Sequence, residues 1–272
     1  MHKKVIITGA GGFIGAYLVN YFHVRSYEVL ALCHQIPVDI IPGVRYRKYN
    51  LGSYIYQKDF ENADYVIHCA FVKYSKKQKD ANELNIQGTK DLYFTSWKHN
   101  VKKFVFLSSL SAHEKASSNY GKSKFETEKI INKDRDAILC PGLVIGDGGL
   151  YKSIEKILST KKNIPLIDGG KQLLYTILIE ELAEIIEKVC LENISGKYIV
   201  ADKKPIMMKD LYNSIAAHLE NKPRFINVPF FLAYIGLSIV EMLNLSLPIT
   251  RENLLGLKQL KAYDDENLYI RL

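Results

Sequence analysis

Two side chains in the segment 117–129 could move a proton. Tyr120 and Lys124 are four residues apart in a stretch of helical composition, so both lie on one face of the predicted helix. A free phenol has a pKa of about 10 and is a poor acid or base at neutral pH. A nearby ammonium group favours the phenolate and lowers that pKa. The spacing therefore predicts that Tyr120 exchanges a proton with a carbonyl or alcohol oxygen, while Lys124 assists it and holds ribose hydroxyls.

A pair of serines stands where it could act on the same oxygen. Ser108 and Ser109 end the apolar run 102–109, which predicts a buried strand eleven residues before Tyr120. A Tyr–Lys pair at this spacing alone is common on surface helices. A strand-end serine followed by that pair is far more specific, and it favours a site for carbonyl or alcohol chemistry.

A glycine-rich turn near the start of the chain predicts an anion site. The apolar run 5–7 indicates a buried strand, and a helical pattern begins directly after the turn T-G-x-x-G-x-x-G, formed by Thr8, Gly9, Gly12 and Gly15. Free backbone N–H groups and the positive end of the helix dipole point at whatever lies above such a turn. Glycine lets a diphosphate approach without meeting a Cβ. The turn predicts a dinucleotide, and tight strand–helix packing alone is the alternative.

Alternating strands and helices must position these residues. Apolar runs predict strands at 5–7, 28–34, 64–70, 102–109 and 136–142, with a helix at 85–100. Such alternation implies an α/β fold with a doubly wound parallel sheet, in which ligands lie beyond the carboxyl ends of the strands. The polar residues singled out above all lie at such ends.

The pattern changes after residue 149. Helical patterns follow at 150–160, 179–192 and 208–219, and one short strand is predicted at 196–201. We therefore expect a cofactor-binding domain at 1–149 and a smaller, mostly helical substrate-binding region at 150–272, whose strand 196–201 returns to the sheet.

Composition excludes several classes of protein. The chain has 272 residues, of which 47% are hydrophobic and 24% charged, as in an ordinary globular protein. A net charge of +8 suits nucleotides or phosphates, but the charge is scattered and no nucleic-acid-binding module is present. Four cysteines stand far apart, without metal-ligand spacing: Cys33, Cys69, Cys140 and Cys190. We expect no metal, no nucleic-acid partner and a reducing cytoplasm.

One apolar segment, 225–249, raises the question of a membrane. Its longest uncharged run, 226–240, is shorter than the ~18 residues that a spanning helix needs. We predict no transmembrane segment and a buried or groove-lining helix, with docking at a membrane surface as the alternative.

These motifs together resemble the extended short-chain dehydrogenase/reductase family, in its branch of nucleotide-sugar epimerases and reductases. T-G-A-G-G-F-I-G (8–15) is similar to the family's phosphate loop, and V-I-H-C-A (66–70) to its V-I-H-x-A strand end. F-V-F-L-S-S (104–109) resembles F-V-x-x-S-S, while C-P-G-L-V-I-G (140–146) is similar to R-P-x-x-V-Y-G with Cys140 in place of the usual Arg. The resemblance implies a Rossmann fold and hydride exchange with a nicotinamide.

The resemblance also assigns roles. Tyr120 would be the acid/base, Lys124 its electrostatic partner and ribose clamp, and Ser109 the residue that orients the substrate oxygen. Asn50 stands where the family usually has an adenine-contacting Asp. The expected cofactor-binding residues are Gly9, Gly12, Phe13, Ile14, Gly15, His34, Asn50, Leu51, Cys69, Ala70, Tyr120 and Lys124.

The end of the second predicted strand bears on the choice of cofactor. An acid there would bind the ribose hydroxyls of NAD and repel a 2′-phosphate. The strand ends in Cys33 and His34, and no carboxylate follows before Asp39. Nothing repels the phosphate, and a cationic His34 would attract it. The sequence therefore favours NADP over NAD, modestly.

We expect a cytoplasmic enzyme, forming a homodimer, that acts on a nucleotide-linked sugar by reducing a 4-keto group or by C4 epimerisation. The Asp-Glu pair that sugar dehydratases of this family carry is replaced by Leu110 and Ser111, so dehydration is not expected. Two alternatives stay open. One is a non-catalytic NAD(P)-binding or assembly protein of the same fold, and the other is a reductase of a non-sugar carbonyl.

Overall fold

The computed structural model describes residues 2–74, 80–242, 254–256 and 269–270. Its main feature is a seven-stranded sheet of order β11-β6-β5-β4-β1-β2-β3, in which every neighbouring pair is parallel. The strands are β1 (Lys4–Thr8), β2 (Glu28–Cys33), β3 (Arg45–Lys48), β4 (Tyr65–His68), β5 (Lys103–Leu107), β6 (Ala137–Pro141) and β11 (Gly196–Val200). The predicted doubly wound, Rossmann-type parallel sheet is confirmed.

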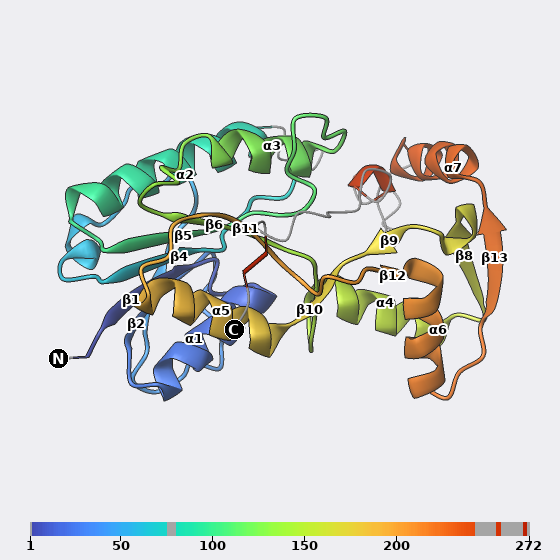
Figure 1. The fold of residues 1–272 in the computed structure, drawn as a ribbon, viewed down its shortest axis with the longest axis horizontal. Coiled ribbons are helices and arrows are strands. Elements are labelled where there is room, and N and C mark those ends of the chain that lie inside the picture. Colours follow the sequence, from blue (N-terminus) through green and yellow to red (C-terminus); the bar gives the residue numbers. More distant parts are fainter. Residues whose placement is uncertain (1, 75–79, 243–253, 257–268, 271–272) are drawn as a thin grey trace.

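Helices cover both faces of this sheet (Figure 1). On one face lie α1 (Phe13–Val24) and α5 (Ile179–Leu191), and on the other lie α2 (Ala81–Lys98) and α3 (Asn119–Glu128). A short 3-10 helix, η1 (Gln57–Phe60), precedes β4. The central strands are apolar because both of their faces are buried. Successive residues of β1 belong to opposite cores, with Val5 and Ile7 in one core and Ile6 in the other.

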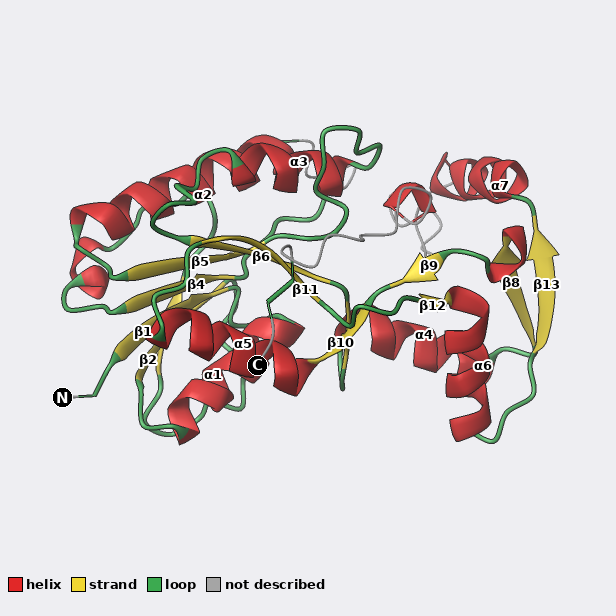
Figure 2. Cartoon of the chain, viewed as in Figure 1, coloured by secondary structure: helices red, strands yellow, loops and turns green. Residues whose placement is uncertain are grey.

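The remaining elements form a lobe beside the carboxyl ends of the strands (Figure 2). It contains α4 (Gly149–Thr160), α6 (Met208–His218), the 3-10 helix η2 (Asp168–Gly170) and an apolar core of its own. Two strand pairs build its frame, parallel β8–β13 and antiparallel β9–β12, with bounds β8 (Asn163–Ile167), β9 (Leu173–Leu174), β12 (Ile206–Met207) and β13 (Arg224–Val228). A third pair, β7 (Leu143–Ile145) and β10 (Thr176–Leu178), joins the lobe to the sheet.

The chain after residue 149 is shared between the two parts. α4, α6 and α7 lie in the lobe, whereas α5 covers the large sheet and β11 pairs with β6 at its edge. The division into a cofactor domain at 1–149 and a substrate region at 150–272 stays a prediction.

The apolar helix α7 (Phe230–Met242) lies at the far end of the lobe (Figure 2). Phe231, Leu232 and Ile235 are 62%, 50% and 52% exposed, so the predicted burial of this helix is wrong for the part whose side chains are described. That prediction extended to residue 249, and residues 243–249 lie outside the described part. Among the described residues, no helix is long and apolar enough to cross a membrane.

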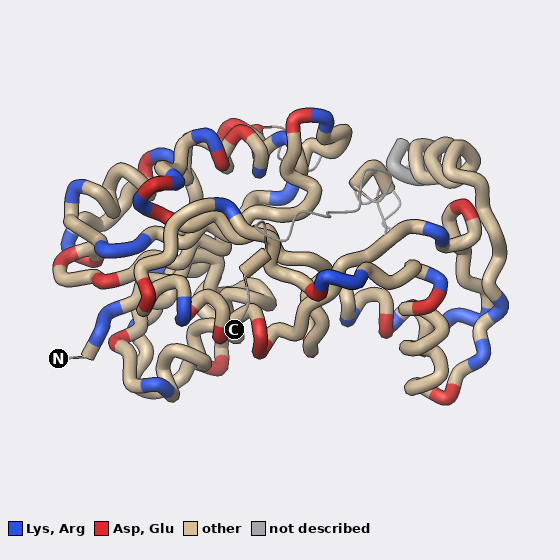
Figure 3. Tube along the Cα trace, in the orientation of Figure 1, with Lys and Arg blue, Asp and Glu red and all other residues tan. Residues whose placement is uncertain are grey.

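Charged residues of both signs are spread over the rest of the molecule (Figure 3). The described part of α7, by contrast, carries neither lysine, arginine nor aspartate before Glu241. The lobe therefore presents an apolar helix with exposed large side chains.

Candidate active site

The glycine turn forms a tight cradle at the amino end of α1. Gly9 has a φ of +68°, and the Gly12 N–H donates to the Gly9 carbonyl at 2.9 Å. A Cβ on Gly9 would lie 2.7 Å from the Ala70 nitrogen, and a Cβ on Gly15 would lie 2.2 Å from the Gly9 oxygen. Gly12 caps the helix without a side-chain hydrogen bond. No capping side chain therefore occupies the N–H groups of the first helical turn. This arrangement fits a diphosphate bound at a helix N-terminus.

The ends of β1 and β4 are joined beside this cradle by a buried polar network. The Thr8 hydroxyl lies 2.6 Å from His68 Nδ1 and accepts from the Ala70 N–H at 3.2 Å. His68 Nε2 lies 2.8 Å from the Thr89 hydroxyl on α2. Complete burial lowers the pKa of His68 to about 3, so this imidazole is neutral. The network brings Cys69 and Ala70 next to Gly9, as predicted for the cofactor strand end.

Sequence reasoning did not single out the members of that network. The glycine-turn motif includes Thr8 and the motif V-I-H-C-A includes His68, but neither motif predicted a contact between these two side chains. A histidine in an otherwise apolar strand was the available signal, since a buried imidazole needs hydrogen-bond partners. Its part here is to fix the spacing between two strand ends.

The predicted adenosine-side residues meet at the carboxyl ends of β2 and β3. A hydrogen bond joins His34 Nδ1 to Asn50 Oδ1, and both groups are exposed. The Tyr49 N–H donates to the Cys33 carbonyl at 2.9 Å, which brings Asn50 opposite His34. Leu51 is buried immediately afterwards.

Phe13 and Ile14, also predicted to bind cofactor, begin α1. Phe13 fills the space beside the turn that leads into α4, because a Cβ on Gly148 would lie 2.3 Å from its ring. Both side chains are half-buried against the core on the α1 face of the sheet. Phe13 thus fixes the amino end of α1 against the 146–149 turn.

The structure brings the three proposed catalytic residues together. A side-chain hydrogen bond joins Tyr120 to Ser109, and the Tyr120 ring meets the edge of Phe71 with 4.9 Å between centroids. Lys124 is 4% exposed, and its Nζ donates to the Leu107 carbonyl at 2.6 Å. The same Nζ lies 5.2 Å from the centre of the Phe71 ring. Phe71, which the sequence analysis missed, therefore closes one side of the site.

Local sequence explains why α3 presents this pair. Ser118 is the N-cap, and its hydroxyl accepts from the Gly121 N–H at 3.0 Å. The helix therefore begins one residue before Tyr120, with Lys124 one turn later. A Cβ on Gly121 would lie 2.3 Å from the Ser111 carbonyl, so glycine permits the close approach of α3 to the loop after β5.

The predicted lowering of the Tyr120 pKa is wrong. Burial raises the pKa of the Tyr120 phenol above its ordinary value, and the hydrogen bond with Ser109 opposes this only in part. The Lys124 ammonium, whose Nζ donates to the Leu107 carbonyl, does not contribute to lowering the pKa of Tyr120. Desolvation also lowers the pKa of Lys124 itself, to about 8. A phenol that retains its proton suits Tyr120 to donation toward a substrate oxygen.

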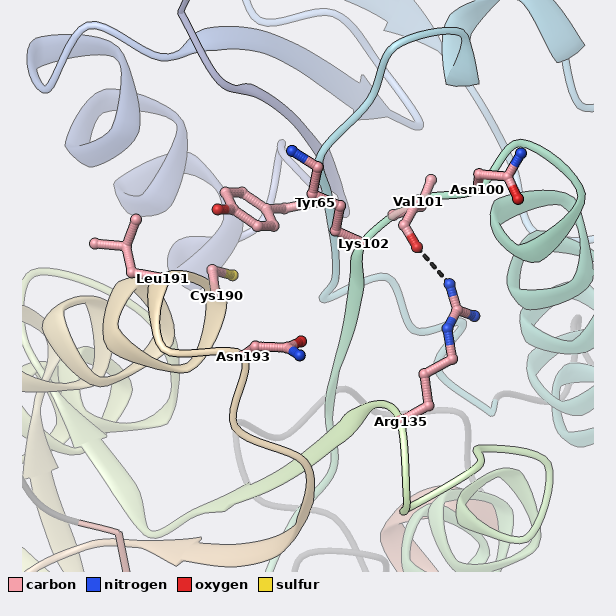
Figure 4. Close-up of a pocket in the computed structure, with 8 residues that line it drawn as sticks. All are labelled: Tyr65, Asn100, Val101, Lys102, Arg135, Cys190, Leu191 and Asn193. Carbon is pink, nitrogen blue, oxygen red and sulfur yellow. Dashed lines mark hydrogen bonds between the residues drawn. The ribbon is translucent and has the colours of Figure 1, made fainter.

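A separate cavity lies at the opposite end of the sheet (Figure 4). Its lining comes from the amino end of β4, the segments that lead into β5, β6 and β11, and the carboxyl end of α5, and consists of Tyr65, Asn100, Val101, Lys102, Arg135, Cys190, Leu191 and Asn193. None of these residues belongs to the predicted site. In the part of the chain that the structure describes, no cluster of three His, Cys, Asp or Glu residues could hold a metal ion.

Residues 5–137 match the model of the NAD dependent epimerase/dehydratase family. This segment belongs to that family. The family segment contains the glycine cradle, the His34–Asn50 pair, Ser109, Tyr120 and Lys124. It ends at the first residue of β6.

Two curated relatives extend the likeness beyond that segment. The chain is 25% identical over 271 residues to a UDP-glucose 4-epimerase of Vibrio cholerae, covering 85% of this chain and 80% of the relative. It is 21% identical over 268 residues to an N-acetyl-alpha-D-glucosaminyl-diphospho-ditrans,octacis-undecaprenol 4-epimerase of Escherichia coli O157:H7, covering 87% and 78%.

Solved structures share the fold. A UDP-glucose 4-epimerase of Thermus thermophilus, solved as a complex with NAD, superposes with a TM-score of 0.68 at 19% identity, covering 83% of this chain and 86% of that one. This likeness of fold extends well beyond the segment 5–137.

Proposed function

We propose that this chain is an NAD(P)-dependent enzyme that transfers a hydride at C4 of a nucleotide-linked sugar, as a C4 epimerase or as a reductase of a 4-keto sugar. The observation that carries this proposal is the hydrogen bond between Ser109 and Tyr120, with Lys124 buried one helical turn below. This group stands at the carboxyl edge of the sheet, where the glycine cradle also opens. The printed names of both curated relatives, which are 4-epimerases, support it.

Each residue has a role that its surroundings explain. Ser109 orients the sugar oxygen, and Tyr120 gives that oxygen a proton or takes one from it. Lys124 holds the Leu107 carbonyl and thereby the strand end, and its remaining donors would hold the ribose hydroxyls of a bound cofactor. Gly9, Gly12 and Gly15 leave room for the pyrophosphate. A bound nicotinamide supplies the hydride acceptor and donor.

We propose that NADP binds at least as well as NAD. The carboxyl end of β2 carries His34 and no carboxylate, and its partner Asn50 is uncharged. Neither side chain carries a negative charge that would repel a 2′-phosphate. The Thermus thermophilus structure was solved with NAD, so the nicotinamide dinucleotide is supported while the preference between the two rests on His34.

A second candidate concerns the carrier of the sugar, and α7 favours it. The helix exposes Phe231, Leu232 and Ile235 at the end of the lobe, and residues 230–240 carry no charged side chain. A lipid diphosphate would keep its sugar near the site while its polyprenyl chain lies along such a helix. The Escherichia coli relative acts, by its printed name, on an undecaprenol-linked sugar. We therefore propose a polyprenyl diphosphate as the alternative carrier.

A substrate panel tests the proposal. The protein, loaded with NADP or NAD, is incubated with UDP-, GDP-, CDP- and dTDP-sugars, with the corresponding 4-keto sugars, and with a polyprenyl diphosphate-linked sugar in detergent. Conversion of a nucleotide sugar supports the primary function, and conversion of the lipid-linked sugar alone supports the second candidate. Demonstrable cofactor binding without any conversion leaves the non-catalytic alternative, whereas reduction of a steroid- or flavonoid-like ketone alone supports the non-sugar reductase.

The assembly and location of the protein are proposals as well. We propose a cytoplasmic homodimer, with residues 150–272 selecting the sugar. Its four cysteines are free in the structure, three of them buried. Light scattering on the eluting protein measures the mass of the assembly, and a mass near that of one chain overturns the dimer.

A further inference from the structure

A buried carboxylate lies behind the site. Glu128, in the last turn of α3, is 3% exposed. Its Oε1 accepts from the Ser108 hydroxyl at 2.5 Å and lies 3.7 Å from the Cys140 thiol. Its Oε2 accepts from Lys197 Nζ at 2.6 Å. A buried charge requires a partner of opposite sign and saturated hydrogen bonding, and Lys197 supplies the charge.

This carboxylate and Lys124 hold consecutive residues of one strand end. Lys124 Nζ donates to the Leu107 carbonyl, and Glu128, one turn further along α3, accepts from Ser108. The Ser108 N–H is also fixed, because it donates to the Leu139 carbonyl of β6 at 2.7 Å. The next residue is Ser109. Two contacts from α3 therefore determine where the chain places the hydroxyl that meets Tyr120.

Lys197 comes from a distant part of the chain. It is the second residue of β11, and it stands sixty residues beyond the end of the family segment 5–137. β11 pairs with β6, with Lys197 in register with Ile138, so the lysine approaches Glu128 from the edge of the sheet. Its side chain is 34% exposed, so Nζ lies at the rim of the buried network, where the ion pair with Glu128 holds it.

We infer that Lys197 is a positioning residue for Ser109: by neutralising Glu128 it keeps that carboxylate on Ser108 and so fixes the strand end that carries the substrate-orienting hydroxyl. The effect on turnover rests on the proposed function, whereas the effect on the strand end does not. Without the cation, the buried carboxylate lacks its charge partner and either turns toward another donor or turns toward water. In both cases the Ser108 contact changes and Ser109 shifts.

Kinetics of matched variants test the inference. A misplacement of about 1 Å costs up to about 10²-fold in rate. We therefore expect Lys197→Met to lower kcat within that range, with KM and cofactor affinity within about twofold of wild type. Lys197→Arg, which keeps the charge, should restore most of kcat. Lys103→Met is the control, because Lys103 is a buried lysine at the other end of β5 that donates to the carbonyls of Arg135 and Asn193. It should lower stability without a selective loss of kcat.

A second measurement does not depend on turnover. The Ser111 N–H donates to Ser109 Oγ at 3.2 Å and the Ala112 N–H to the Ser109 carbonyl at 3.0 Å. Hydrogen exchange of a peptide covering 108–112, measured against a peptide from β1, thus reports on Ser109. Lys197→Met should speed this exchange relative to β1, and Lys197→Arg and Lys103→Met should not.

A double variant covers the case in which Lys197→Met folds poorly. Glu128→Gln keeps an acceptor for Ser108 but removes the charge, so adding Lys197→Met to it should change little. Unchanged exchange in Lys197→Met, or an equal local effect in Lys103→Met, overturns the inference. If the wild type converts no sugar while exchange responds as expected, the proposed function fails and the positioning role stands.

Discussion

Replacing Gly15 by alanine tests the cradle at the amino end of α1. The new Cβ would lie 2.2 Å from the Gly9 oxygen and 2.7 Å from the Gly9 carbonyl carbon, both backbone atoms. A Cβ contact needs about 3.0 Å, so α1 and the turn must separate by at least 0.8 Å. Gly9 itself lies against the end of β4, because a Cβ on Gly9 would lie 2.7 Å from the Ala70 nitrogen. The turn must therefore open where the pyrophosphate would bind.

The magnitudes follow from two opposing effects. Overpacking costs about 1–3 kcal/mol, while alanine is about 1 kcal/mol better than glycine inside a helix. We expect the free energy of unfolding to fall by roughly 0–2 kcal/mol. Cofactor affinity should fall at least about tenfold, which corresponds to about 1.4 kcal/mol of binding free energy.

Fluorescence titration with NADPH and NADH measures the affinity, and denaturant unfolding measures the stability. Gly11→Ala is the matched control in the same turn. Its Cβ would meet the Gln35 carbonyl at 3.6 Å and the Cys33 Cβ at 3.7 Å, which are ordinary contacts, and it should keep affinity within about threefold. Wild-type affinity in Gly15→Ala, or equal losses in both variants, would refute the assignment of this turn to the cofactor.

Three further predictions concern the site. Tyr120→Phe keeps the ring against Phe71 and removes the transferable proton, so turnover should fall about 10²–10⁴-fold with nearly unchanged cofactor affinity; equal turnover in the variant would contradict the acid/base role. His34→Asp should move the preference toward NAD, because a carboxylate repels the 2′-phosphate; a constant ratio of NADPH to NADH affinity would show that His34 does not contact that group. Burial lowers the pKa of Lys124 from 10.5 to about 8. At pH values between these two pKa values the unfolded chain binds a proton that the folded chain lacks, so raising the pH stabilises the fold through this group. Lys124→Met removes that contribution, so its stability relative to wild type should fall by roughly 1–3 kcal/mol between pH values of about 7.5 and about 10; parallel pH profiles in urea unfolding would contradict it.

The sequence predicted the parts of the fold that depend on local pattern. Each apolar run from 5–7 to 136–142 became a strand of the large sheet, because central parallel strands are buried on both faces. The order of glycine turn, strand-end serine and Tyr–Lys helix brought Ser109, Tyr120 and Lys124 together, since carboxyl ends of parallel strands share one edge.

Features that depend on tertiary contacts could not be predicted in the same way. The pKa of Tyr120 depends on desolvation and on the hydrogen bond with Ser109, and spacing along α3 determines neither. The contact between Glu128 and Lys197 joins residues 69 positions apart, through the pairing of β11 with β6. The exposure of α7 follows from the absence of a described element over its outer face, whereas hydrophobicity alone predicted burial.

The most direct measurement traces a deuterium atom placed at C4 of a nucleotide sugar that carries a C4 hydroxyl or, for a 4-keto sugar, on the reduced nicotinamide, from which hydride transfer would carry it to C4. If a hydride moves between C4 and the nicotinamide beside Tyr120, the deuterium is retained at C4 of the epimerised product or recovered on the nicotinamide ring, as mass spectrometry would show. Deuterium that is lost to water, or that remains on unchanged substrate while cofactor is bound, would contradict the proposed hydride transfer.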